Sequence, residues 1–167
     1  RYFFCFWPNM MVILIAVVMA ANLFSVSPVI FDYKGKARDI FQDSIILTNK
    51  ANRKITIYAF VNNLSAVDGP LKFIDPGLAD QRASLANWIA ITRGVIEISP
   101  GRQKKIDFSI NVAPNAQPGI YHALVSFVAA GSRYEAETQV ITAPNSVINL
   151  EVLDNAVQKL QLKKLMN

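Results

Sequence analysis

The side chains with the richest chemistry are scarce in this chain. His122 is its only histidine and Cys5 is its only cysteine. Zinc sites are built from three or four histidine, cysteine or carboxylate ligands, so a site at His122 would need carboxylates for all its other ligands. A serine, histidine and aspartate catalytic set would also depend on His122, yet no Gly-x-Ser-x-Gly turn precedes it. We therefore expect a structural or solvent-facing His122.

Acidic residues suggest two further kinds of site. Glu135 and Glu137 stand two apart in a segment with strand alternation, which places both on one face, whereas glycosidase carboxylates face each other across a cleft. Asp68, Asp75 and Asp80 lie in a long irregular segment without the dense Asp-x-Asp spacing of a calcium loop. We expect both groups to be solvated. The sequence predicts no catalytic, metal-binding or cofactor-binding residues, and a protein that is not an enzyme.

Trp88 and the sequence Asn63-Leu64-Ser65 are two further features to weigh as surface sites. An exposed Trp88 could stack on a carbohydrate, but its place at the start of an apolar run favours the core. Asn63-Leu64-Ser65 matches the sequon for asparagine glycosylation, which is a signal of only three residues. Neither feature specifies a ligand.

The charge of the chain argues against nucleic acid as a partner. Seventeen Lys and Arg against twelve Asp and Glu give a formal net charge of +5. The basic residues are scattered, with local concentrations only at 102–105 and 159–164, so we interpret them as solvated charge. Attraction to an anionic cell envelope is the alternative. Because Cys5 stands alone, no intrachain disulfide is possible, and the fold must depend on its core.

Residues 1–24 are predicted to be a signal peptide or a membrane anchor. The run MMVILIAVVMAA, residues 10–21, has the length of the apolar region of a signal peptide. A membrane-spanning helix needs about 20 apolar residues, and here it would contain Pro8, Asn9 and Asn22. A cleaved signal peptide is therefore favoured over a retained anchor helix, and both predict export.

Residues 25–153 are predicted to form one immunoglobulin-like antiparallel β-sandwich. Period-two alternation interrupted by turn residues is typical of half-buried antiparallel strands. Strands are expected at 25–32, 44–49, 54–62, 88–92, 95–98, 105–112, 120–130, 134–142 and 147–153. The strand at 54–62 is apolar on both faces and is expected to be central, whereas Pro28 marks an edge. Residues 63–87 are expected to be irregular, with helical turns at 79–86, and residues 154–167 to be a linker or the start of a following domain.

One run carries a resemblance to known domains. Residues 98–127, ISPGRQKKIDFSINVAPNAQPGIYHALVSF, join a Pro-Gly turn, an alternating strand, a loop, and a second Pro-Gly that opens the next strand. This pattern resembles bacterial secreted immunoglobulin-like domains. It is similar to the N-terminal, peptidoglycan-binding domain of WxL-interacting cell-surface proteins, and more distantly to pilus chaperones. The resemblance implies that Tyr121 forms a tyrosine corner, in which its hydroxyl reaches a nearby backbone group.

These observations predict a non-enzymatic, exported cell-envelope module that acts as a spacer, adhesion element or attachment domain. A periplasmic pilus-type assembly chaperone, or a filament subunit that retains its N-terminal helix, are the alternatives. The expected partner is a cell-wall polymer or another surface protein, with membrane contact through the N-terminal segment and no nucleic acid. Binding is expected at residues 63–87 or at an edge strand, because a free edge accepts a strand from a partner.

Overall fold

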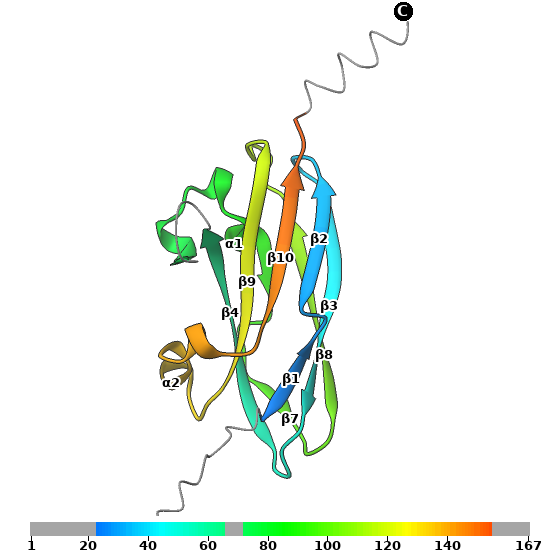
Figure 1. Ribbon diagram of the computed structural model, residues 1–167, viewed down its shortest axis with the longest axis vertical. Coiled ribbons are helices and arrows are strands. Elements are labelled where there is room, and N and C mark those ends of the chain that lie inside the picture. Colours follow the sequence, from blue (N-terminus) through cyan, green and yellow to red (C-terminus); the bar gives the residue numbers. More distant parts are fainter. Residues whose placement is uncertain (1–22, 66–71, 155–167) are drawn as a thin grey trace, which may run out of the picture.

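The computed structural model describes residues 23–65 and 72–154, and they form two β-sheets packed face to face (Figure 1). This arrangement confirms the predicted all-β sandwich. The predicted linker at 154–167 lies outside the described residues except for Asp154. The predicted leader at 1–24 also lies outside them except for Leu23 and Phe24, and Phe24 begins the first strand. Within the described ranges no helix has the length and apolar character needed to cross a membrane.

One sheet has four strands in the order β1-β3-β8-β6 and is antiparallel throughout. Its strands are β1 (Phe24–Ser27), β3 (Ile40–Asn49), β6 (Ile89–Ile91) and β8 (Gln103–Asn111). The other sheet has the order β2-β10-β9-β4-β5, and β7 pairs with a different part of β4. Its strands are β2 (Ile30–Gly35), β4 (Ile55–Ser65), β5 (Lys72–Ile74), β7 (Ile96–Ile98), β9 (Gly119–Ala129) and β10 (Asn145–Val152).

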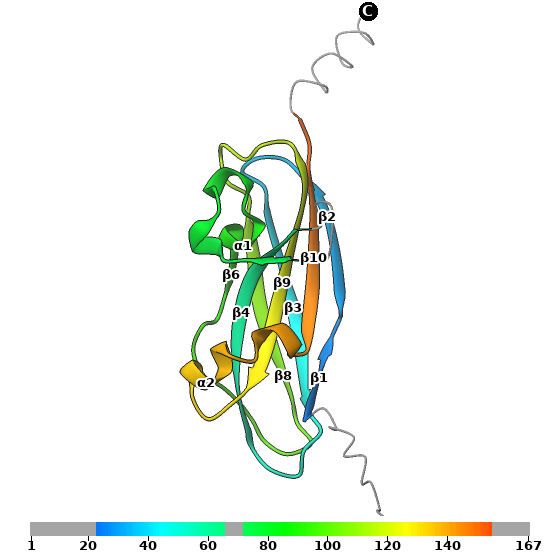
Figure 2. The same cartoon turned by 60° about the vertical axis from the view of Figure 1, so that its left-hand side comes forward.

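Short helices occupy two of the connections (Figure 2). The connection between β5 and β6 contains the 3-10 helices η1 (Pro76–Leu78) and η2 (Gln81–Ala83) and the α-helix α1 (Leu85–Trp88). The connection between β9 and β10 contains α2 (Arg133–Glu137) and the 3-10 helix η3 (Val140–Thr142). The helical turns predicted within 79–86 are thus present.

The alternation of β8 was predicted correctly. Ile106, Phe108 and Ile110 point into the core and are each at most 4% exposed. The predicted apolar character of both faces of β4 is also confirmed, although only the two ends of β4 are paired on the side away from β9. Ile57 on one face of β4 packs in the main core, and Tyr58 on the other face packs in a smaller cluster beside α2.

The strand predicted at 25–32 is wrong as a single strand. It divides at Pro28 into β1, which pairs with β3 in one sheet, and β2, which pairs with β10 in the other. Proline has no N–H to donate to a ladder, so the pairing is interrupted there and the chain passes from one sheet to the other. The β2–β10 pair is parallel, which corrects the prediction of a wholly antiparallel sandwich.

The strand predicted at 134–142 is also wrong, because this segment forms α2 and η3. The sequence holds the missed signal, since Ser132 and Glu135 have the Ser-x-x-Glu spacing of a helix N-terminus. The Ser132 hydroxyl accepts a hydrogen bond from the Glu135 amide at 3.2 Å. Ala136 is fully buried against the sheet, and this contact stabilises the helix in place of a strand.

The predicted Ser99-Pro100-Gly101 turn joins β7 to β8. The Arg102 amide donates to the Ser99 carbonyl at 3.1 Å, and Gly101 has φ +65°. A type II turn requires this left-handed conformation at its third residue, where glycine carries no steric cost.

We predict that Gly101→Ala destabilises the domain by about 1 kcal/mol, because a Cβ atom is unfavourable in the left-handed region. No neighbouring atom lies within 4 Å of the added methyl group, so backbone strain is the only expected cause. Urea unfolding followed by circular dichroism measures the change. Gly94→Ala is the matched control, since Gly94 has no positive φ and its nearest neighbour would be 3.8 Å away. Equal midpoints for both variants would contradict this account of the turn.

Candidate binding surface

The residues considered for catalysis do not come together. His122 lies in β9, where its Nδ1 is 2.7 Å from the Asn149 Oδ1 of β10. Glu135 and Glu137 lie in α2; Glu135 accepts from the Gly131 amide at 3.0 Å, and Glu137 is 3.8 Å from the Arg133 guanidinium. Among the described residues, no three histidine, cysteine or acidic side chains are grouped so that they could hold a metal ion.

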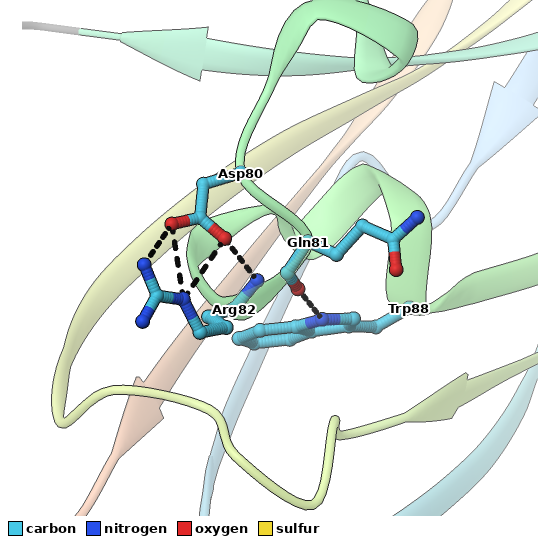
Figure 3. Close-up of polar contacts among 4 residues, drawn as sticks. All are labelled: Asp80, Gln81, Arg82 and Trp88. Atoms are coloured by element: carbon cyan, nitrogen blue, oxygen red, sulfur yellow. Dashed lines mark hydrogen bonds and ion pairs between the residues drawn. The ribbon is translucent and has the colours of Figure 1, made fainter.

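The loop acids have local structural roles. Asp75 accepts from the Gly77 amide at 2.8 Å, which begins η1. Asp80 accepts from the Arg82 amide at 2.9 Å and forms an ion pair with the Arg82 side chain at 2.7 Å (Figure 3). These hydrogen bonds lower the pKa of the Asp80 carboxyl. Both acids therefore begin short helices, and Asp68 lies outside the described residues.

Trp88 belongs to the core, as the sequence indicated. Its side chain is 4% exposed, and its Nε1 donates to the Gln81 carbonyl at 2.7 Å (Figure 3). The indole ring meets the Tyr121 ring edge to face, with centroids 5.1 Å apart. A buried indole has no face left to stack on a carbohydrate.

Tyr121 forms the predicted tyrosine corner. Its hydroxyl donates to the Gln117 carbonyl at 2.7 Å, and the Gln117 amide donates to the Arg82 carbonyl at 3.1 Å. The corner thus links the start of β9 to η2. Burial, with the Asp80 charge as a smaller cause, raises the pKa of the Tyr121 phenol.

Asn63 fixes the segment between β5 and β6 to the end of β4. Its side-chain amide donates to the Ser84 hydroxyl at 2.8 Å, and its side-chain carbonyl accepts from the Ala86 amide at 2.9 Å. Asn63 is 9% exposed and Ser84 is fully buried. An amide held in this way is not available as a glycan acceptor, so the sequon has a structural role.

The strand edges differ in how completely they are paired. β10 is paired on both sides, with β9 along its whole length and with β2 from Val147 to Val152. β4 is paired with β9 on one side. On its other side β7 covers only Ile55–Ile57 and β5 only Asn63–Ser65, so residues 58–62 have no strand partner there among the described residues.

Two arginines that the sequence analysis did not single out lie beside this part of β4. The Arg133 guanidinium carbon is 4.6 Å from the centre of the Phe60 ring, and its Nη1 donates to the Arg93 carbonyl at 3.0 Å. The two residues are 40 positions apart, and their proximity depends on α2, which was predicted as a strand. No local signal in the sequence points to this pair.

No protein-family model and no curated protein sequence matches this chain. Solved structures do share its fold. PapD-like domain 7 of human CEP192 matches with a TM-score of 0.54 at 8% identity, over 88% of this chain and 99% of that domain. The class 5 fimbriae chaperone CfaA matches with a TM-score of 0.53 at 14% identity, over 79% of this chain and 58% of the chaperone.

A family 123 glycoside hydrolase from Clostridium perfringens also matches, with a TM-score of 0.52 at 14% identity, over 75% of this chain but 23% of the enzyme. At such identities these matches establish a fold of the PapD-like and immunoglobulin-like type and nothing finer. The chain spans just over half the length of the chaperone. The resemblance to WxL-interacting proteins remains a prediction.

We predict that Asn63→Ala destabilises the domain by about 1–3 kcal/mol, because it leaves the buried Ser84 hydroxyl and Ala86 amide without their partner. Limited proteolysis should then cut first within residues 72–92, since this segment loses its attachment to β4. Asn62→Ala is the control on the same strand, and we expect a change within about 0.5 kcal/mol. Similar stability and cleavage for both variants would show that Asn63 does not hold the segment.

Proposed function

We propose that this chain is a non-enzymatic module of the bacterial cell envelope that holds a segment of another surface protein, as an assembly chaperone does. The main support is the match of the sandwich to a fimbrial chaperone over 79% of the chain. The sequence favours a spacer, adhesion or attachment domain, with a pilus-type chaperone or a filament subunit as the alternatives. The match supports the chaperone alternative better than the main prediction.

The side chains agree with a binding role. The residues considered for chemistry are each used in a local contact: His122 with Asn149, Asp80 with Arg82, and Glu135 with Gly131. A catalytic site brings a nucleophile, a base and a stabilising group to one point, and these residues do not converge. A protein that binds through backbone groups and apolar contacts needs no such arrangement.

The experiment is to purify the tagged, exported protein from its native host and to delete its gene in a parallel strain. A chaperone should elute as a complex with one exported protein in a fixed ratio, and that partner should be degraded or aggregate in the deletion strain. Restoring the gene should restore the partner. A protein that elutes alone, binds isolated cell wall, and leaves the levels of other exported proteins unchanged would contradict the proposal and favour an attachment domain.

A further inference from the structure

Beside the middle of β4, on the side away from β9, no strand among the described residues pairs with residues 58–62. β5 and β7 both run antiparallel to β4 on the same side of it, β5 beside Asn63–Ser65 and β7 beside Ile55–Ile57. Between them the chain leaves the sheet, and it returns only after passing through η1, η2, α1 and β6. A strand that entered this space would complete the sheet between β5 and β7.

Alternate residues in the middle of β4 direct their backbone N–H and C=O groups toward this space. The Thr56 carbonyl accepts from the Ala130 amide at the end of β9, so Thr56 and alternate residues after it direct their backbone groups toward β9. Ala59 and Val61 lie between those residues and direct their N–H and C=O groups to the opposite side. No loop or side chain of the described residues hydrogen bonds to these groups.

A cavity of about 300 Å³ follows this edge. Residues 59–62 line one wall, and Pro76, Asn87, Ile91 and Arg93 are among the residues on the other walls. Ala59 is only 1% exposed. Buried backbone polar groups are normally paired, and leaving one without a partner costs free energy comparable to a lost hydrogen bond. The cavity therefore favours an occupant that has backbone donors and acceptors of its own.

The charges around the cavity favour an anion. Arg93 is exposed, and its guanidinium makes no hydrogen bond or ion pair with the described residues. Arg133 lies over the Phe60 ring and is 3.8 Å from Glu137. Asp75 is the acid that lines the cavity, and its Oδ1 accepts from the Gly77 amide. Arginine pairs well with carboxylates, so Arg93 is suited to bind one.

We propose that the edge of β4 at Ala59 and Val61 binds an extended segment of a partner protein, antiparallel to β4, with an acidic side chain near Arg93. This inference rests on the proposed function, since it assumes that the partner is a protein. A segment of about three residues is enough to pair the N–H and C=O groups of both residues. A segment antiparallel to β4 runs from β5 toward β7. Arg93 lies just before β7 in the chain, so the acidic residue belongs near the C-terminal end of the segment.

The probe is a synthetic peptide, acetylated and amidated, with the sequence Thr-Val-Thr-Val-Glu, and its control replaces the Glu by Gln. Amide hydrogen exchange measured by NMR reports on Ala59 and Val61 directly. We expect both amides to exchange at least tenfold more slowly at saturating Glu peptide, and the Glu peptide to bind about tenfold more tightly than the Gln peptide. Unchanged exchange, protection confined to another edge, or equal affinities in the wild-type protein would overturn the proposal.

Two variants locate the site. Arg93→Gln should remove the difference between the two peptides, whereas Arg102→Gln, at an exposed arginine in the β7–β8 turn, should preserve it. Val61→Pro removes an N–H that has no partner in the part of the chain that the structure describes, so thermal unfolding should show a folded protein that no longer binds the peptide. If the Gln peptide with a free C-terminus binds and the amidated Glu peptide does not, the proposal that an acidic side chain binds near Arg93 is overturned.

The same variants separate this proposal from the proposed function. If the exported wild-type protein forms a complex with a partner and the Val61→Pro and Arg93→Gln proteins form it equally well, the site is wrong and the function stands. If the wild-type protein has no partner but peptide binding follows the pattern above, the chaperone function is wrong and the binding edge stands.

Discussion

The contact between the inward rows of the two sheets is the interaction on which the rest of the structure depends. In one sheet, Ile45 and Leu47 of β3 and Ile110 of β8 are fully buried. In the other sheet, Ile57 of β4 and Phe127 of β9 are fully buried. Burying side chains of this size contributes about 1.5–3 kcal/mol each. With Cys5 as the only cysteine, this core holds the domain together without a disulfide.

The connections between the sheets decide which strand edges remain open. At Pro28 the chain passes from β1 to β2, and β2 then covers β10. The connection from β5 to β6 passes from one sheet to the other, held by Asn63 on β4 and by the contact of Trp88 with Tyr121. Because this connection leaves the sheet early, backbone groups in the middle of β4, beside a cavity and two arginines, have no partner within residues 23–65 and 72–154.

Much of the fold could be predicted from local patterns. The alternation of β8, the two apolar faces of β4 and the turn at Gly101 follow from residue type and spacing, whereas the hydroxyl contact of Tyr121 was implied by the resemblance to immunoglobulin-like domains. Residues 134–142 were predicted as a strand from their alternation alone, and the helix-capping pair Ser132 and Glu135 was missed. The candidate binding surface was only outlined, as residues 63–87 or an edge strand, and Arg93 and Arg133 were not among the residues considered.

Along strands such as β8, the sequence by itself determined which side chains are buried, because alternation along one strand is a local property and burial favours apolar groups. Only the tertiary structure decided which strands lie side by side, and therefore which backbone groups are paired. Every residue except proline carries the same N–H and C=O, so nothing in the identity of Ala59 or Val61 shows that its backbone lacks a partner among the described strands. That property depends on β5 and β7, whose positions beside β4 are set by the whole fold.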